Sequence, residues 1–218
     1  MDMKEKEFKI RCSAIGQIMT NSRTKSNPLS KTTEAYVQEW MKEQIYGGQK
    51  FMGNKYTQKG LDMENDAIDY FSEEAGHGFL VKNDVKYENE FMTGTPDLIH
   101  NGVVIDIKNS WDHWTFPLFE DKIPTKDYYW QLQGYMALTN LDKAQLVYTL
   151  METPDDLLNQ WTDVPYEYDH LEGKYRIKVF NVERNNEDIQ KIYDRVAECR
   201  DYITTLNKQL NVERTIRL

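Results

Sequence analysis

The dipeptide Asn101-Gly102 restricts the fold of this chain more than any other feature of its sequence. Asn-Gly favours the left-handed backbone of a two-residue turn, and that turn type joins neighbouring antiparallel strands. Apolar and β-branched residues are frequent on both sides of the dipeptide, in residues 91–100 and 103–109. We therefore predict two strands over these residues, joined as a hairpin.

This hairpin brings two carboxylates together. Because a two-residue turn pairs His100 with Val103, Asp97 comes directly opposite Asp106. Directly opposed Cβ atoms in an antiparallel pair are about 4.5–5.5 Å apart, so like charges there need a cation or a shared proton. Lys108 points to the same face as Asp106, because strand side chains alternate. A hard divalent ion, Mg²⁺ or Mn²⁺, suits such an all-oxygen site. The alternative is an ordinary solvated charge cluster on a surface hairpin.

Hydrophobic periodicity divides the rest of the chain into helices and further strands. Helices are predicted over residues 13–19, 33–45, 56–75 and 127–138, with a polar loop over 21–31. The buried face of the third helix is predicted to carry Leu61, Ala67, Ile68, Tyr70 and Phe71. Further strands are predicted over residues 79–87, 144–151 and 175–182, and a long amphipathic helix ends at residue 210. Residues 1–218 are therefore expected to form one α/β domain with a short mixed central sheet flanked by helices, and residues 175–210 supply its C-terminal strand and helix.

Composition limits the class of protein. Lys and Arg number 27 against 36 Asp and Glu, a net charge of −9, which argues against binding to nucleic acid through uniform basicity. The two cysteines, Cys12 and Cys199, have neither the spacing of a zinc site nor that of a disulfide framework. The first residues are charged, and no apolar run is long enough to span a membrane. We expect a cytoplasmic protein with no membrane contact.

Four motifs in a fixed order resemble the PD-(D/E)xK nuclease superfamily, in the branch that contains RecB-type nuclease domains and the YqaJ/lambda-exonuclease family. They occupy residues 60–135, which form the expected core. The motifs are a helix acid at Glu64, Pro96-Asp97, Asp106-Ile107-Lys108, and the Q-x-x-x-Y element from Gln131 to Tyr135. The resemblance implies a restriction-endonuclease-like α/β/α core.

The resemblance also implies roles for these residues. Glu64, Asp97 and Asp106 would be metal ligands, joined by the backbone carbonyl of Ile107, and Lys108 would position the attacking water. Two features depart from the pattern. Many relatives have Glu where this chain has Asp106, which shortens the reach by one methylene. Asp62 and Asp66 also flank Glu64, and both are alternatives for the helix acid.

Four further residues are assigned to DNA or to support of the catalytic lysine. Gln131 and Tyr135 would support Lys108 or the DNA backbone from the neighbouring helix. The segment 11–18 resembles the one that opens phage exonucleases of this kind, which makes Arg11 and Ser13 candidates for a 5′-phosphate pocket. Its alternative is an ordinary helix N-cap at Ser13 with Arg11 on the surface.

The activity implied is that of a Mg²⁺-dependent deoxyribonuclease with two metal ions, for which Mn²⁺ can substitute. The form expected is a 5′-to-3′ exonuclease that acts on double-stranded ends and feeds recombination by single-strand annealing. A single-strand annealing protein is the expected partner, and a homo-oligomer, plausibly a trimeric ring, is the expected assembly. Two alternatives stay open: a structure-specific endonuclease or resolvase of the same superfamily, and a catalytically idle DNA-binding module.

Three other groups of residues bear on function. The histidines lack metal-site spacing and are expected at the surface, and the aromatic run over residues 111–130 is expected in the core or at a contact, or against bases. An acidic protein needs a local basic groove to hold DNA. The candidates are Arg23, Lys25, Lys31, Lys108, Lys122 and Lys126.

Overall fold

The computed structural model describes residues 7–24, 28–48 and 53–216, with side chains through residue 210. Lys25 of the predicted basic groove lies outside these residues. The helices are α1 (Ile15–Ile18), α2 (Lys31–Tyr46), α3 (Lys55–Asp62), α4 (Glu64–Glu74), α5 (Lys126–Thr139) and α6 (Asn186–Ile216), with 3₁₀ turns η1 (Cys12–Ala14), η2 (Asp155–Leu157) and η3 (Gly173–Tyr175). The strands are β1 (Ile10–Arg11), β2 (Tyr87–Glu88), β3 (Met92–Gly94), β4 (Leu98–His100), β5 (Val103–Asn109), β6 (Lys143–Thr149) and β7 (Ile177–Glu183).

The central sheet has four strands in the order β4-β5-β6-β7 and is mixed, because β5 and β6 run parallel while the outer pairs run antiparallel. β4 and β5 form the predicted hairpin, with His100 paired to Val103. Asn101 and Gly102 both have positive φ, at 48° and 77°, as the turn requires. The register therefore confirms the pairing predicted from the dipeptide.

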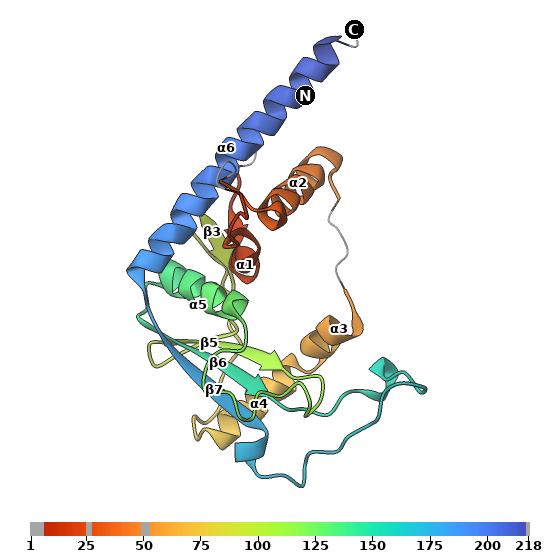
Figure 1. Ribbon diagram of the computed structural model, residues 1–218. Helices are drawn as coiled ribbons and strands as arrows, with labels where there is room; N and C mark the ends of the chain where they lie inside the picture. Colours follow the sequence, from red (N-terminus) through yellow and green to blue (C-terminus); the bar gives the residue numbers. More distant parts are fainter. Residues whose placement is uncertain (1–6, 25–27, 49–52, 217–218) are drawn as a thin grey trace.

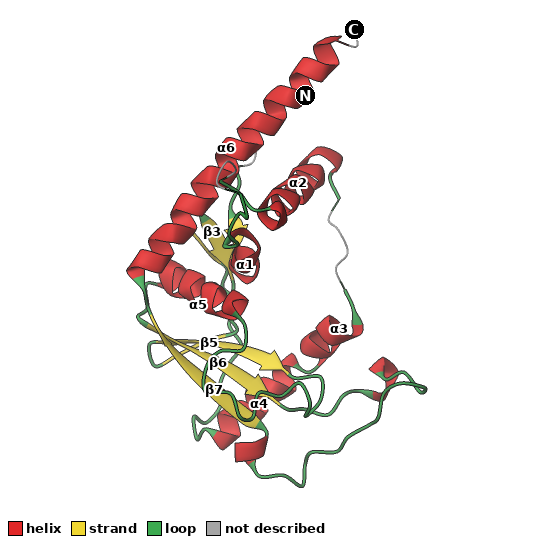
Figure 2. Cartoon of the chain, in the orientation of Figure 1, coloured by secondary structure: helices red, strands yellow, loops and turns green. Residues whose placement is uncertain are grey.

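Helices cover both faces of this sheet (Figures 1 and 2). On one face, Val104 and Leu146 pack into a core with α1, α2, α5 and α6. On the other face, Ile105 and Val147 join Phe71 of α4 in a second, smaller core. Alternate residues of the same strand thus serve opposite layers, and the predicted α/β/α architecture is confirmed.

A small second sheet in the order β1-β3-β2 joins the N-terminal segment to the core. β1 runs parallel to β3, which pairs Arg11 with Thr93. A Cβ at Gly94 or at Gly134 of α5 would lie within 3 Å of the Cys12 sulfur. Only glycine permits these approaches, so both positions hold η1 tightly against α5 and β3.

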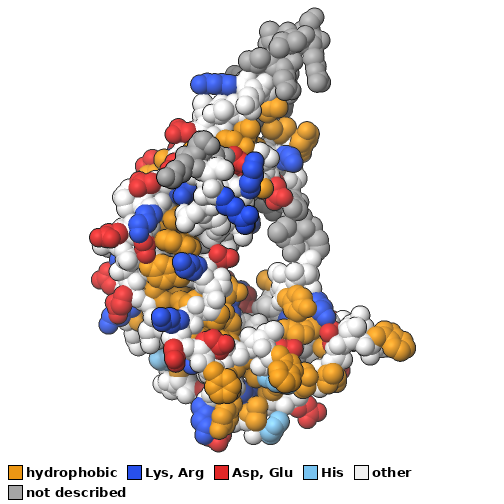
Figure 3. Space-filling model, in the orientation of Figure 1, with side chains coloured by type: hydrophobic (Ala, Val, Ile, Leu, Met, Phe, Trp, Pro, Cys, Tyr) orange, Lys and Arg blue, Asp and Glu red, His pale blue; other side chains and the backbone are white. Residues whose placement is uncertain are grey.

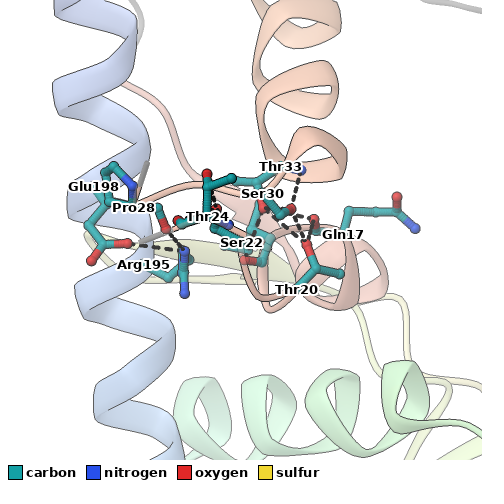
Figure 4. Close-up of polar contacts among 10 residues, drawn as sticks. Gln17, Thr20, Ser22, Thr24, Pro28, Ser30, Thr33, Arg195 and Glu198 are labelled. Atoms are coloured by element: carbon teal, nitrogen blue, oxygen red, sulfur yellow. Dashed lines mark hydrogen bonds and ion pairs between the residues drawn. The ribbon is translucent and has the colours of Figure 1, made fainter. Parts of the chain in front are cut away.

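The predicted polar loop over residues 21–31 is anchored by hydroxyl groups (Figure 4). Ser30 is the N-cap of α2 and accepts a hydrogen bond from the Thr33 backbone N–H at 3.0 Å. Thr33 Oγ1 lies 3.2 Å from Thr20 Oγ1, which ties the end of α1 to the start of α2. Arg195 of α6 donates to the Pro28 carbonyl at 2.9 Å. The loop therefore belongs to the body of the domain.

Three predicted elements differ in the structure. The helix expected over 56–75 breaks at Met63, whose φ and ψ of −98° and 7° end α3 and precede α4. The strand expected over 91–100 divides into β3 and β4, which belong to different sheets. The dividing residues include Pro96, which has no N–H for a ladder. The break re-aims the chain so that Asp97 reaches β5.

The strand expected over 79–87 is mostly irregular, and only its end enters β2. Asn83 explains this, because its side chain accepts from the Val85 N–H and donates to the Val85 and Pro96 carbonyls. These bonds replace a strand ladder. Leu61 also differs: it was predicted in the buried face of its helix and is 63% exposed, whereas Lys59 of the same helix is buried.

Within the described ranges 7–24, 28–48 and 53–216, every helix is too short or too polar to cross a membrane.

Candidate active site

Asp106 is the centre of the candidate site. Its side chain lies on β5, faces α5 and is only 1% exposed. Gln131 Nε2 of α5 donates to Asp106 Oδ1 at 2.9 Å and to the Tyr135 hydroxyl oxygen at 3.0 Å. Burial and the charge of Asp106 raise the pKa of Tyr135, so its hydroxyl stays protonated. The Q-x-x-x-Y element therefore contacts the carboxylate of Asp106, and its support of Lys108 or the DNA backbone stays a prediction.

Asp97 reaches the same point from the residue before β4. Its Oδ2 accepts a hydrogen bond from the Ile107 backbone N–H at 2.7 Å, so it lies beside the Asp106–Ile107 peptide. Burial and the neighbouring charge of Asp106 raise the pKa of Asp97 to about 7. Burial contributes most to this shift, and the effect of Asp106 is the repulsion expected of two opposed carboxylates.

Lys108 is the third member of the group. Its Nζ lies 2.8 Å from Asp106 Oδ2 and 5.1 Å from the centroid of the Tyr128 ring. Burial alone disfavours the ammonium, but Asp106 and Asp97 outweigh burial and raise the pKa of Lys108. The lysine is therefore a fixed positive charge at neutral pH.

The donor set fits a hard divalent ion, although not as a complete site. Apart from the ion pair with Lys108, the buried Asp106 Oδ2 receives no hydrogen bond within the described part of the chain. An unsatisfied carboxylate oxygen opposite a second carboxylate is what Mg²⁺ or Mn²⁺ binds. Nevertheless, no cluster of three His, Cys, Asp or Glu side chains poised for a metal occurs in residues 7–24, 28–48 and 53–216.

Glu64, the expected third carboxylate, is turned to another partner. It is the first residue of α4, and its Oε2 lies 2.6 Å from Lys82 Nζ. Its charge still contributes to the raised pKa of Asp97, so it is close to the pair. Its role as a ligand stays a prediction, as does the role of the Ile107 carbonyl.

The N-terminal candidates lie on the segment that packs against β3 and α5. Arg11 and Ser13 are both exposed and flank Cys12, which contacts Gly94 and Gly134. Burial, with a smaller effect of the charge of Asp106, raises the pKa of the Cys12 thiol. The assignment of Arg11 and Ser13 to a 5′-phosphate pocket stays a prediction.

Basic side chains do not form one stripe on the face shown in Figure 3. Lys and Arg side chains are interspersed there with Asp and Glu, and the surface is hollowed between α1 and α3. Of the predicted groove, Arg23, Lys31, Lys122 and Lys126 are exposed. The predicted aromatic run divides, since Phe116 is buried while Trp114 and Phe119 are 78% and 89% exposed.

The sequence analysis did not predict the roles of two lysines near the site. Lys59 is 1% exposed, and its Nζ donates to the carbonyls of Ser110, Trp111 and Met151. Its only signal was its place within the helix predicted over residues 56–75. Lys82 gave no signal, because it lies in a segment that reads as a strand.

A family model described as the YqaJ-like viral recombinase domain matches residues 3–142. A search of curated protein sequences found no match. Among solved structures, a phage-related exonuclease from Haemophilus somnus 129PT is 32% identical with a TM-score of 0.82, and the alignment covers 94% of this chain and 97% of that one.

A more distant likeness extends to an alkaline exonuclease, LHK-Exo, from Laribacter hongkongensis. It is 18% identical with a TM-score of 0.70, over 96% of this chain and 95% of that one. A structure of LHK-Exo in complex with dAMP gives a TM-score of 0.71 at the same identity. At 18% identity these two likenesses show the fold alone. The family model matches more than half of the chain and so shows the family. The chain therefore belongs to the YqaJ-like viral recombinase family, within the PD-(D/E)xK nuclease superfamily.

Proposed function

We propose that this protein is a Mg²⁺-dependent deoxyribonuclease that digests double-stranded DNA from the 5′ end during phage or prophage recombination. The observation that carries the proposal is the convergence of Asp97, Asp106 and Lys108, with Gln131 bonded to the same carboxylate. Burying two acids side by side is costly for folding. Their presence therefore indicates a functional role. The family match and the likeness to a phage-related exonuclease support the same activity.

The carboxylates would hold the metal. Asp97 and Asp106 are the primary ligands in this proposal, with Glu64 and the Ile107 carbonyl as further ones. Two Mg²⁺ ions, or Mn²⁺ in their place, would supply an activated water and would neutralise charge on the leaving 3′-oxygen. The raised pKa of Asp97 supports this assignment, because two such acids share their site more readily with a cation than with each other.

The other side chains would position these groups. Gln131 fixes the orientation of the Asp106 carboxylate through Oδ1 and leaves Oδ2 toward Lys108. Lys108 would orient the attacking water and stabilise negative charge on the phosphate. Tyr128 lies under the ammonium at 5.1 Å and restricts its movement.

Substrate and partners follow from the same proposal. Arg11 and Ser13 would bind the 5′-phosphate of a duplex end. A nucleotide-bound relative, the dAMP complex of LHK-Exo, supports nucleotide binding in this fold. We expect a homo-oligomer, plausibly a trimeric ring that encloses DNA, a single-strand annealing protein as partner, and a place of action in the host cytoplasm.

The test uses linear duplexes that carry a phosphate at either the 5′ or the 3′ end, and covalently closed circles of the same sequence. We expect Mg²⁺-dependent release of nucleotides from 5′-phosphorylated linear DNA only. Asp106→Asn and Lys108→Ala should each reduce the rate by at least about 100-fold. The matched control is Asp121→Asn, which removes an exposed acid outside the site.

The results separate the alternatives. Cleavage of closed circles would favour an endonuclease or resolvase of the same superfamily. Metal binding without hydrolysis would favour an idle DNA-binding module. Wild-type rates in a folded Asp106→Asn protein would refute the proposed site.

A further inference from the structure

Lys82 makes an ion pair with a residue that the proposed function needs for metal. Its Nζ lies 2.6 Å from Glu64 Oε2, and the two side chains are 39% and 23% exposed. The same contact is a hydrogen bond that Lys82 donates. In this structure the carboxylate of Glu64 is therefore already paired with a cation, the ammonium of Lys82.

The backbone fixes Lys82 at this place. The next residue, Asn83, donates its backbone N–H to the Asp97 carbonyl at 2.8 Å, and its side chain donates to the Pro96 carbonyl at 2.9 Å. The backbone next to Lys82 is thus bonded to Asp97, and the Lys82 side chain extends to Glu64. The hydrogen bond that Lys82 donates to Glu64, with smaller effects of the charges of Glu64, Asp84 and Asp97, raises the pKa of Lys82, so its side chain is a cation beside Glu64.

The acids of the site are thus divided between two lysines. Lys108 lies on Asp106, and Lys82 lies on Glu64. Unlike Lys108, Lys82 belongs to none of the nuclease motifs. A protonated amine cannot ligate a metal, and its charge opposes that of a divalent ion at the same carboxylate.

We propose that Lys82 is the counter-ion of Glu64 in the metal-free protein and that a divalent ion displaces it, so that Lys82 lowers metal affinity by competition. This inference rests on the proposed function, because it takes Glu64 as a metal ligand. The opposite possibility is that Lys82 holds Glu64 in place for the metal. The two possibilities predict opposite changes in affinity.

The first measurement is Mn²⁺ binding to the purified full chain by titration calorimetry. A partly exposed ion pair contributes about 0.2–1 kcal/mol, so Lys82→Met should bind Mn²⁺ up to about 5-fold more tightly than wild type. Lys82→Arg keeps the charge and should stay close to wild type. The matched control is Lys86→Met, which removes an exposed lysine from the same segment. Thermal unfolding by circular dichroism checks that each variant is folded.

The second measurement follows the amine itself. Reductive methylation, read by peptide mass spectrometry, should modify Lys82 faster with Mn²⁺ than with a chelator, while the rate at Lys86 stays constant. Weaker or unchanged Mn²⁺ binding by Lys82→Met, or a labelling rate that metal does not raise, would overturn the role of Lys82 alone. A wild-type protein that binds no Mn²⁺ would overturn the proposed metal site as well.

Discussion

Replacement of Lys59 by Met tests how the site is tied to the helix layer. The ammonium is buried and donates to three backbone carbonyls, those of Ser110 at 2.8 Å, Trp111 at 2.9 Å and Met151 at 2.6 Å. The first two carbonyls follow β5 and the third follows β6. Met has a similar length and volume but donates no hydrogen bond, so the substitution removes the three bonds without opening a large cavity.

The size of the effect follows from two opposing contributions. Each carbonyl left without a donor costs about 1–3 kcal/mol of unfolding free energy. Burial lowers the pKa of Lys59 from 10.5 to about 8, so holding the charge inside costs the wild type about 3 kcal/mol, which Met does not incur. With three carbonyls at about 2 kcal/mol each and an offset of about 3 kcal/mol, we expect Lys59→Met to lose about 3 kcal/mol at pH 7.

The sign of the pH dependence gives a sharper test. Between pH 8 and 10.5 the unfolded chain keeps a proton on this amine that the folded protein has lost, so wild-type stability rises with pH through this group. The difference in stability between wild type and Lys59→Met should therefore widen between pH 8 and 10. Urea unfolding followed by circular dichroism at pH 7, 8.5 and 10 measures it.

Lys55→Met is the matched control for this series. Lys55 lies on the same helix, but it is partly exposed and pairs with Asp163. Its loss should cost at most about 1 kcal/mol. A Lys59→Met protein as stable as the control, or a difference that narrows as the pH rises, would refute the reasoning.

Two further predictions concern the acid pair and the packing of α5. In metal-free protein, the raised pKa of Asp97, about 7, favours folding below pH 4 and loses that contribution as the pH rises through 7. In the presence of a chelator, the melting temperature of wild type should therefore fall between pH 5 and pH 8, and that of Asp97→Asn should fall less. Equal dependence of the two melting temperatures on pH would contradict this. Gly134→Ala places a Cβ 2.5 Å from Ile15 Cδ1 and should cost about 1–3 kcal/mol. Gly60→Ala, which has open space, should instead stabilise by up to about 1 kcal/mol in the same urea assay, and a gain in both variants would exclude the packing argument.

The sequence predicted those parts of the site that local rules control. The Asn101-Gly102 turn determines which residues pair, so the approach of Asp97 to Asp106 followed from the position of one dipeptide. The face of β5 that carries Asp106 and Lys108 followed from strand alternation.

Contacts between distant segments were not predictable in this way. The acceptors of Lys59 lie up to 92 positions away in the chain, and no periodicity indicates a lysine that ends in carbonyls. The helix break at Met63 was not predicted, because apolar residues continue with helical spacing on both sides of it. The pair between Lys82 and Glu64 depends on the irregular segment that Asn83 creates.

The tight seat of Cys12 between Gly94 and Gly134 also provides a native reporter group. The thiol is buried, and its raised pKa keeps it unreactive while the segment is closed. A maleimide or disulfide reagent can reach the sulfur only when the segment 10–14 separates from α5. The rate of Cys12 alkylation therefore measures how often the N-terminal segment opens, and a bound 5′-phosphate should slow that rate.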